Sequence, residues 1–328
     1  METKNYENGI TVLSLFDGCS AAYLALEKAG FKINNYYSSE IDKHCLAVQK
    51  HHYADNPNFH QIGDVRFINP MDYIDVDLII FGSPCTQLSS VNPKDRSGLS
   101  GPDSSLFYNA LEILKLISIF KPHNEKLYFL MENVASMPTK DKETITEELR
   151  ELIPTTQMYK IDSAVIAPAH RRRLYWTNIP NVTIPEPFGK SYQQILVNGF
   201  VDKDKANVLL SSDVTQTNGI KRYYSMNIGN IIFKDKDFAE LPIAEKLQRY
   251  PAILKASGYD SKKGAATSDY DFVNGCYRLP SVLERERMMT IPDGYVSGVP
   301  NIPKSEQKKI LGLSFTVDVV SHILGFIK

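Results

Sequence analysis

Short apolar runs alternate with runs of helical spacing through the first half of the chain. Residues 12–16, 33–38 and 76–82 have the pattern of buried strands, and residues 21–29 and 105–120 have that of helices. A near-continuous apolar strand such as 76–82 is typical of a parallel sheet covered on both faces. The alternation therefore predicts an α/β fold with a doubly wound, mostly parallel sheet and a smaller, irregular second domain.

The pattern weakens near Ile179, where prolines and a mixture of polar residues replace the alternation. A helical pattern returns near Ser281 and continues to the end of the chain. We expect a first domain over residues 1–178, a smaller domain over 179–275, and a segment over 276–328 that returns to the first domain.

Polar residues whose side chains could bind a ligand or react follow the predicted strands. In a doubly wound sheet, ligands bind at the carboxyl ends of the strands, so residues that share this position are expected to share one site. Each acid alone would as readily cap a helix or a turn, and it is the shared position that carries the prediction. These residues are Asp17, Glu40, Asp64, Cys85 and Glu132.

A turn over Phe16-Asp17-Gly18 separates the first strand from the first helix, where backbone N–H groups can receive a polar ligand. Glu40 after the second strand could bind ribose hydroxyls, and Asp64 could accept from an adenine amino group. The chain has neither a Walker A loop nor a GxGxxG turn, which argues against ATP and NAD. The remaining common nucleoside cofactor is S-adenosylmethionine.

Cys85 follows Gly82-Ser83-Pro84 and precedes a polar run. Although a cysteine is more often a core residue, this loop at a strand end favours an exposed, nucleophilic thiol. Glu132 ends another apolar strand and is a candidate acid. Arg171 and Arg173 alternate on a predicted strand, so we expect them to share a face and to bind an anionic group or a carbonyl oxygen.

The formal net charge is −1, so a nucleic-acid partner would need a local cluster of cations, such as the one at Lys221 and Arg222. The four cysteines form no CxxC pair, which argues against a metal site and against a disulfide framework. The first residues lack an apolar leader and no apolar run is long enough for a membrane span. We therefore expect a cytoplasmic protein without metal or membrane contact.

The order of these motifs resembles the cytosine-5 DNA methyltransferases. Gly82-Ser83-Pro84-Cys85 and Glu132-Asn133-Val134 carry most of the likeness, together with His170-Arg171-Arg172-Arg173 and Leu311–Val317. Val91-Asn92-Pro93 is similar to the animal de novo enzymes, as is Ala169 before His170. We expect a compact microbial or viral form, because the sequence shows no regulatory domain before the first motif. Leu313 departs from the family, which often has an asparagine at this position.

The resemblance implies the fold of the S-adenosylmethionine-dependent methyltransferases and transfer of a methyl group to C5 of a cytosine flipped from double-stranded DNA. Cys85 would attack C6 of the ring, Glu132 would act at N3, and Arg173 would contact the carbonyl oxygen. Arg171 would hold the cysteine loop or a phosphate.

The family also implies a function for each domain, with catalysis and cofactor binding in 1–178 and target recognition in 179–275. The protein is expected to be a monomer in a bacterial or phage-infected cell, or wherever its DNA is. A restriction–modification role, an orphan role and viral self-protection remain open. The expected cofactor residues are Phe16, Asp17, Gly18, Glu40, Ile41, Asp64, Val65, Ser314 and Phe315, and the expected DNA-binding residues are Ser89, Asn92, Lys221 and Arg222.

Three alternatives remain at this point. One is an RNA cytosine-5 methyltransferase with the same chemistry. Another is a non-catalytic DNA-binding protein on the same fold, against which the intact Cys85 and Glu132 argue. The last is a small-molecule dehydrogenase or methyltransferase, which explains neither the irregular second region nor the cysteine loop.

Overall fold

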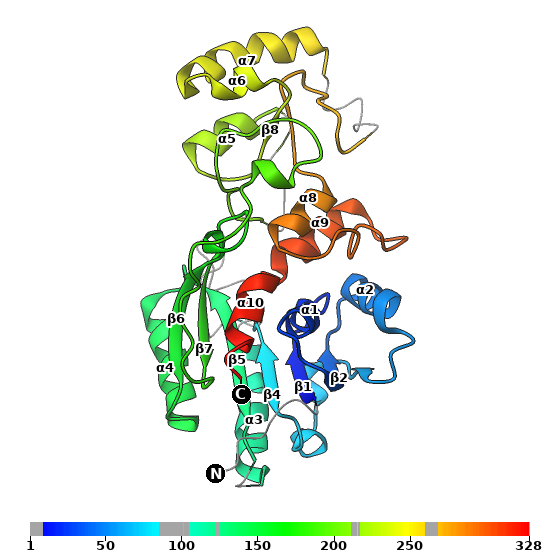
Figure 1. The fold of residues 1–328 in the computed structure, drawn as a ribbon, viewed down its shortest axis with the longest axis vertical. Helices are drawn as coiled ribbons and strands as arrows, with labels where there is room; N and C mark the ends of the chain where they lie inside the picture. Colours follow the sequence, from blue (N-terminus) through cyan, green and yellow to red (C-terminus); the bar gives the residue numbers. More distant parts are fainter. Residues whose placement is uncertain are drawn as a thin grey trace. The chain divides into compact units, whose positions relative to one another are not determined.

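The structure is a computed structural model of the 328-residue chain, and it divides into two compact units. We call the first the sheet unit; it contains the chain up to Asp162, Arg172–Pro185, and the chain from Val317. The second unit contains Ser163–Arg171 and Glu186–Thr316. Figure 1 shows the course of the chain through both. The residues that the structure describes are 9–84, 101, 105–122, 125–210, 215, 217–259 and 268–327.

A seven-stranded sheet forms the centre of the sheet unit, in the order β3-β2-β1-β4-β5-β7-β6. Only β7 runs antiparallel to its neighbours, β5 and β6. This arrangement confirms the predicted α/β fold with a mostly parallel sheet. The strands are β1 (Ile10–Leu15), β2 (Ile33–Ser39), β3 (Phe59–Gln61), β4 (Leu78–Phe81), β5 (Tyr128–Val134), β6 (Gln157–Asp162) and β7 (Arg172–Thr177).

Successive residues of a strand point to opposite faces of the sheet, and both faces are covered. Leu13, Ile79 and Phe129 belong to one apolar cluster with residues of α3 (Leu106–Phe120) and α4 (Thr139–Leu152). The alternate residues Val12, Ile80 and Leu130 are also buried. On that side lie α1 (Ala21–Lys28) and α10 (Val317–Leu324), which pack against each other (Figure 1). Next to the sheet are also α2 (Lys43–Tyr53) and the 3₁₀ turns η2 (Val65–Phe67) and η3 (Pro70–Tyr73).

The second unit contains little sheet. Its two-stranded sheet joins β8 (Ile232–Phe233) to β9 (Tyr277–Arg278), and its buried apolar cluster includes Tyr223, Phe233 and Tyr277. The helices are α5 (Gly219–Ser225), α6 (Lys236–Glu240), α7 (Ile243–Ser257), α8 (Val282–Met288) and α9 (Lys304–Leu313), with 3₁₀ turns η5 (Ser163–Val165) and η6 (Gln193–Ile195).

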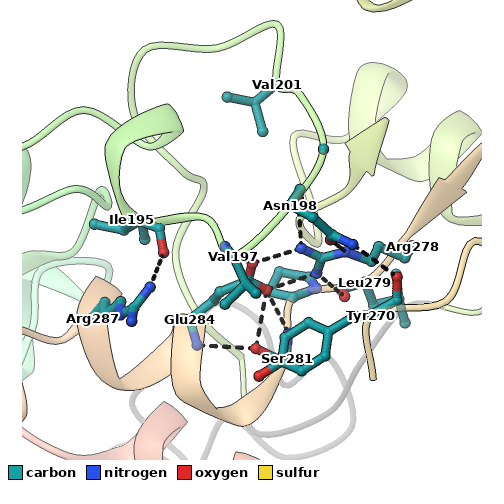
Figure 2. A network of polar contacts seen from close by, with 12 residues as sticks. Ile195, Val197, Asn198, Val201, Tyr270, Arg278, Leu279, Ser281, Glu284 and Arg287 are labelled. Carbon is teal, nitrogen blue, oxygen red and sulfur yellow. Dashed lines mark hydrogen bonds and ion pairs between the residues drawn. The ribbon is translucent and has the colours of Figure 1, made fainter. Parts of the chain in front are cut away.

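A buried ion pair between Arg278 and Glu284 connects distant parts of the second unit (Figure 2). The two guanidinium Nη atoms donate to the two carboxylate oxygens over 2.6 and 2.7 Å, and both side chains are essentially inaccessible. The Arg278 Nε donates to Asn198 Oδ1 over 2.7 Å, and the Val197 N–H donates to Glu284 over 2.9 Å. Because Glu284 also completes a capping box with Ser281, the pair fixes the start of α8 and the 197–198 segment together.

The chain re-enters the sheet unit at Val317. The segment over 276–328, which we expected to return to the first domain, reaches the sheet unit with α10, and its part before Val317 lies in the second unit. Arg278 and Glu284 attach the start of α8 to residues 197–198 of the same unit. The functional division into 1–178, 179–275 and 276–328 stays a prediction.

Removing the Glu284 charge should destabilise the second unit. Glu284→Gln leaves the buried Arg278 guanidinium without its counter-charge, so we expect a loss of about 3–5 kcal/mol in the free energy of unfolding at neutral pH. Glu240→Gln is the control, because the Lys236–Glu240 pair is 66% exposed on both sides and should contribute less than about 0.5 kcal/mol. Denaturant unfolding of the three proteins measures both effects, and equal losses would contradict the role of the buried pair.

The same variant has a defined pH dependence. Burial raises the pKa of Glu284, but the hydrogen bonds and charge of Arg278 outweigh burial, and the pKa lies below its ordinary value of 4.5. A lowered pKa stabilises the fold above pH 4.5, and this contribution is lost as the pH falls through the folded-state pKa. The difference in unfolding free energy between wild type and Glu284→Gln should therefore narrow below pH 4.5.

Candidate active site at the carboxyl edge of the sheet

The order of the strands reverses between β1 and β4, and in doubly wound sheets ligands bind at this point. Leu15 at the end of β1 is the register partner of Phe81 at the end of β4. The turn over Phe16-Asp17-Gly18 and the segment Gly82-Ser83-Pro84 therefore leave the sheet next to each other. Cys85, Ser89 and Asn92 lie outside the described residues.

The turn after β1 has an unusual backbone conformation. Phe16, Gly18 and Ser20 all have positive φ angles, of 56°, 61° and 62°. Both polar groups of Gly18 are held, because its N–H donates to Glu40 Oε2 over 2.7 Å and its carbonyl oxygen accepts from Gln49 Nε2 over 2.8 Å. Left-handed φ at non-glycine residues costs free energy, so the surrounding contacts must maintain the turn.

The Asp17 carboxylate points into the protein rather than to the edge of the sheet. It is 4% exposed and accepts hydrogen bonds from the hydroxyls of Ser14, Ser20, Tyr36 and Ser38 over 2.5 to 2.8 Å. Desolvation by burial raises the pKa of Asp17, although the hydrogen bonds from these hydroxyls oppose the shift. The sequence predicted Asp17 as a cofactor residue, and only its backbone forms part of the turn.

The predicted ribose and adenine residues lie on the neighbouring strand ends. Glu40 follows β2, and its Oε1 accepts from the N–H groups of Ile41 and Asp42 over 2.7 Å, while the Ile41 side chain is 65% exposed. Asp64 accepts from Arg66 through both oxygens, and these hydrogen bonds hold the pKa of Asp64 below its ordinary value. Val65, between Asp64 and Arg66, is buried and belongs to the apolar core.

Glu132 and Arg173 form an ion pair between adjacent strands. The distance from Arg173 Nε to Glu132 Oε1 is 2.7 Å, and the two side chains are only 13% and 12% exposed. Glu132 lies inside β5, which extends to Val134, and Val134 is the register partner of Arg173 on β7. The structure therefore brings together a carboxylate and a guanidinium that the sequence assigned to one site.

Asn133 connects β5 to the segment that leads to Cys85. Its Nδ2 donates to the carbonyl oxygen and to Oγ of Ser83 over 3.4 and 3.3 Å, and both residues are buried. Since Phe81 pairs with Met131, this segment leaves the sheet beside Glu132. Asn133 therefore ties the end of β5 to Ser83, two residues before Cys85.

Arg171 does not share a face of a strand with Arg173, which corrects the sequence-based expectation. The antiparallel ladder of β7 begins at Arg172, and the buried Arg171 belongs to the second unit. Its Nη atoms donate to the carbonyl oxygens of Gly312 and Ser314 over 3.1 and 2.8 Å. Arg171 therefore fixes the segment that contains Ser314 and Phe315, both of which are largely buried.

The predicted DNA-binding cations lie on α5 of the second unit. Lys221 and Arg222 are exposed, and neither makes an ion pair within the part of the chain that the structure describes. The next two residues attach the helix, because the hydroxyls of Tyr223 and Tyr224 donate to Asp202. The helix thus turns its tyrosines inward and its cations to solvent.

The described residues form neither a metal centre nor a membrane-spanning helix. Among the described residues, no group of three or more His, Cys, Asp or Glu side chains is placed to hold a metal ion. No helix in the same residues has the length and apolar character needed to cross a membrane.

Comparison with known proteins decides the family. The family model for C-5 cytosine-specific DNA methylases matches residues 10–328. The chain belongs to this family. It is 28% identical to the type II methyltransferase M.NgoBI of Neisseria gonorrhoeae, over 94% of this chain and 90% of that protein. It is 27% identical to M.HaeII of Haemophilus aegyptius, over 95% and 91%.

Solved structures agree at the level of the fold. A DNMT2 variant of Spodoptera frugiperda superimposes with a TM-score of 0.63 at 17% identity, over 97% of this chain and 99% of that one. DNMT2 of S. pombe gives 0.63 at 16% identity, over 97% and 98%. Family membership confirms the predicted activity, methyl transfer to C5 of cytosine in DNA, and it implies use of S-adenosylmethionine.

Several residues that shape this site were absent from the sequence-based prediction. Gln49 lies on α2, and Tyr36 lies inside β2, so neither follows a strand end. Arg66 was missed because a surface arginine next to a turn has no distinctive pattern. The spacing of Asp64 and Arg66 was the one available signal, since an acid and a cation two residues apart can pair in a turn.

Asn133 provides a test of the connection between β5 and the cysteine loop. Asn133→Ala removes the two hydrogen bonds to Ser83, which should cost about 1 kcal/mol of unfolding free energy. It should also lower the rate of single-turnover methyl transfer, because the segment that leads to Cys85 loses its attachment to β5. Asn178→Ala is a matched control, because Asn178 binds the backbone of Leu127 and Phe129 at the opposite end of β5. It should lose similar stability and keep its methyl-transfer rate; similar rates in both variants would contradict the connection.

Proposed function

We propose that this methylase uses S-adenosylmethionine to methylate a cytosine flipped out of duplex DNA, through a covalent adduct with Cys85. The observation that supports it most is the Glu132–Arg173 pair beside the segment that leads to Cys85. A carboxylate and a guanidinium at the same strand edge can act together on N3 and the neighbouring carbonyl oxygen of one cytosine ring.

The residues around the turn after β1 fit a nucleoside cofactor. Glu40 accepts three backbone N–H groups, which leaves one of the roughly four acceptor positions of a carboxylate for a ribose hydroxyl. The exposed Ile41 side chain offers an apolar surface to an adenine ring. Asp64 and Val65 complete the adenine end, while Phe16 and Gly18 form the turn. Ser314 and Phe315 would close the methionine end, as the family resemblance implies.

The chemistry assigned to the protein residues is an addition followed by an elimination. The Cys85 thiolate forms a bond to C6 of the cytosine, and Glu132 gives or shares a proton at N3 so that charge does not accumulate in the ring. Arg173 donates to the carbonyl oxygen and stabilises the same charge. S-adenosylmethionine, when bound, supplies the methyl group. Loss of the C5 proton to a base then expels the thiolate from C6, and the N3 proton returns to Glu132.

DNA binding is assigned mainly to the second unit. Lys221 and Arg222 project from α5, where they can neutralise phosphates and release counterions. Ser89 and Asn92 would contact the DNA from the cysteine loop, and we expect one protein chain to act as a monomer. The relatives named type II methyltransferases support a modification role within a restriction–modification system.

Covalent trapping tests the role of Cys85. Duplex DNA with 5-fluorocytosine at the target should remain attached to the wild-type protein, because fluorine cannot leave from C5 as a proton does. Peptide mapping should find the adduct at Cys85, and Cys85→Ser should form none while still binding DNA and S-adenosylmethionine. Attachment at Cys19, Cys45 or Cys276, or near-normal turnover of the serine variant, would overturn the assignment.

Salt-dependent DNA binding tests the cations on α5. Replacing Lys221 and Arg222 by Ala should weaken binding to specific and random duplexes alike and reduce the slope of log K against log salt by about 0.9 for each lost phosphate contact. Lys32→Ala with Lys140→Ala is the control, since both are exposed cations of the sheet unit. The affinity for S-adenosylmethionine should stay unchanged in both, and equal DNA affinities would place the contact surface elsewhere.

A further inference from the structure

Five donors from four successive elements converge on the Asp17 carboxylate. Ser14 of β1 and Tyr36 of β2 donate to Oδ1, each over 2.5 Å. Oδ2 accepts from Ser20 before α1 and Ser38 of β2, and from Gln49 of α2 over 3.1 Å. Both oxygens are therefore fully used inside the protein, and the carboxylate has no capacity left for a ligand.

Gln49 extends this network to the turn itself. Its two Nε2–H groups serve three acceptors, one of the hydrogens being shared: Asp17 Oδ2, Ser38 Oγ at 2.9 Å and the Gly18 carbonyl oxygen at 2.8 Å. On the other side of the same residue, the Gly18 N–H donates to Glu40. Asp17 is therefore connected through Gln49 to the Gly18 carbonyl oxygen, and the Gly18 N–H connects the same residue to Glu40.

We propose that Asp17 is a positioning residue for the cofactor, which it does not touch. Its carboxylate holds the turn over Phe16-Asp17-Gly18 in its left-handed conformation and keeps Glu40 at the distance needed to bind ribose. This inference rests on the proposed use of S-adenosylmethionine at the carboxyl edge. It reassigns the side chain that the sequence places in the cofactor pocket to the layer beneath that pocket.

The chemistry of the donors explains why a carboxylate is required. Four hydroxyls and one amide N–H₂ point at two oxygens, and an anion accepts such bonds more strongly than a neutral amide does. In Asp17→Asn, an NH₂ group at the Oδ2 position would face the donating NH₂ of Gln49. At the Oδ1 position it would face two hydroxyls at 2.5 Å, which would have to move and reverse.

A control exists at the opposite edge of the sheet, where β4 begins beside the start of β1. Asp77 is equally buried at 4% exposure, and it accepts from the Thr11 N–H over 2.9 Å near the start of β1. Asp77→Asn therefore perturbs a buried carboxylate of the same sheet without contact to the turn. A merely structural role of Asp17 predicts that the two asparagine variants behave alike.

The test compares the full-length wild type, Asp17→Asn and Asp77→Asn. Binding of S-adenosylmethionine and of S-adenosylhomocysteine is measured by titration calorimetry without DNA, and methyl transfer is measured across cofactor concentrations. We expect Asp17→Asn to weaken both ligands about tenfold, as loss of a charged hydrogen bond predicts, with kcat at saturating cofactor within about twofold of wild type. Asp77→Asn should bind both ligands with the affinity of the wild type, although it loses thermal stability as Asp17→Asn does.

Unchanged cofactor affinity in Asp17→Asn, or equal loss in both variants, would overturn the inference. If Asp17→Asn does not fold, Gln49→Met takes its place, because it keeps the four hydroxyl bonds and removes the link to the Gly18 carbonyl oxygen. It should then weaken the cofactor with little change in DNA affinity, and wild-type cofactor affinity in Gln49→Met would overturn the inference as well. Failure of the wild type itself to bind S-adenosylmethionine would count against the proposed function instead.

Discussion

The site depends on the reversal of strand order between β1 and β4. These strands are parallel neighbours, and their last residues, Leu15 and Phe81, are register partners. The chain leaves them toward opposite halves of the sheet, so the turn after β1 and the segment before Cys85 separate at one point. β5 is the next strand, and it adds Glu132 to the same edge. One topological feature thus places the turn after β1, the segment that leads to Cys85, and Glu132 together.

Buried polar contacts hold this edge in a defined geometry. Asp17, Glu132 and Asn133 each reach a partner on another element: the donors around Asp17, Arg173 on β7 and Ser83 after β4. Buried polar groups without partners are costly, so such contacts restrict the edge to few conformations. Arg278 and Glu284 do the same in the second unit. Preorganised catalysis requires that the neighbours of the reacting side chains hold them in a fixed geometry.

The sequence predicted the sheet well because the alternation of buried strands and helices is a local pattern. For the same reason, it placed Glu40 and Asp64 correctly after the ends of two strands. It could not place Arg171, because three consecutive arginines do not show where an antiparallel ladder starts; pairing of Arg172 with Asp162 on β6 decides that. Nor could it show that the Asp17 side chain turns inward, since this follows from positive φ angles and donors on β2 and α2. The contact between Arg278 and Asn198, which are distant in sequence, was equally beyond a local pattern.

The most direct test of the account is a bisulfite map of DNA from cells that express the protein, made beside the map from cells that express Cys85→Ser. The account predicts protected cytosines in one fixed sequence context for the wild type and none for the variant. Protection that persists in Cys85→Ser would contradict the covalent mechanism. Absence of protected cytosines in DNA, with methylation found in tRNA from the same cells, would contradict the assignment of DNA as the substrate.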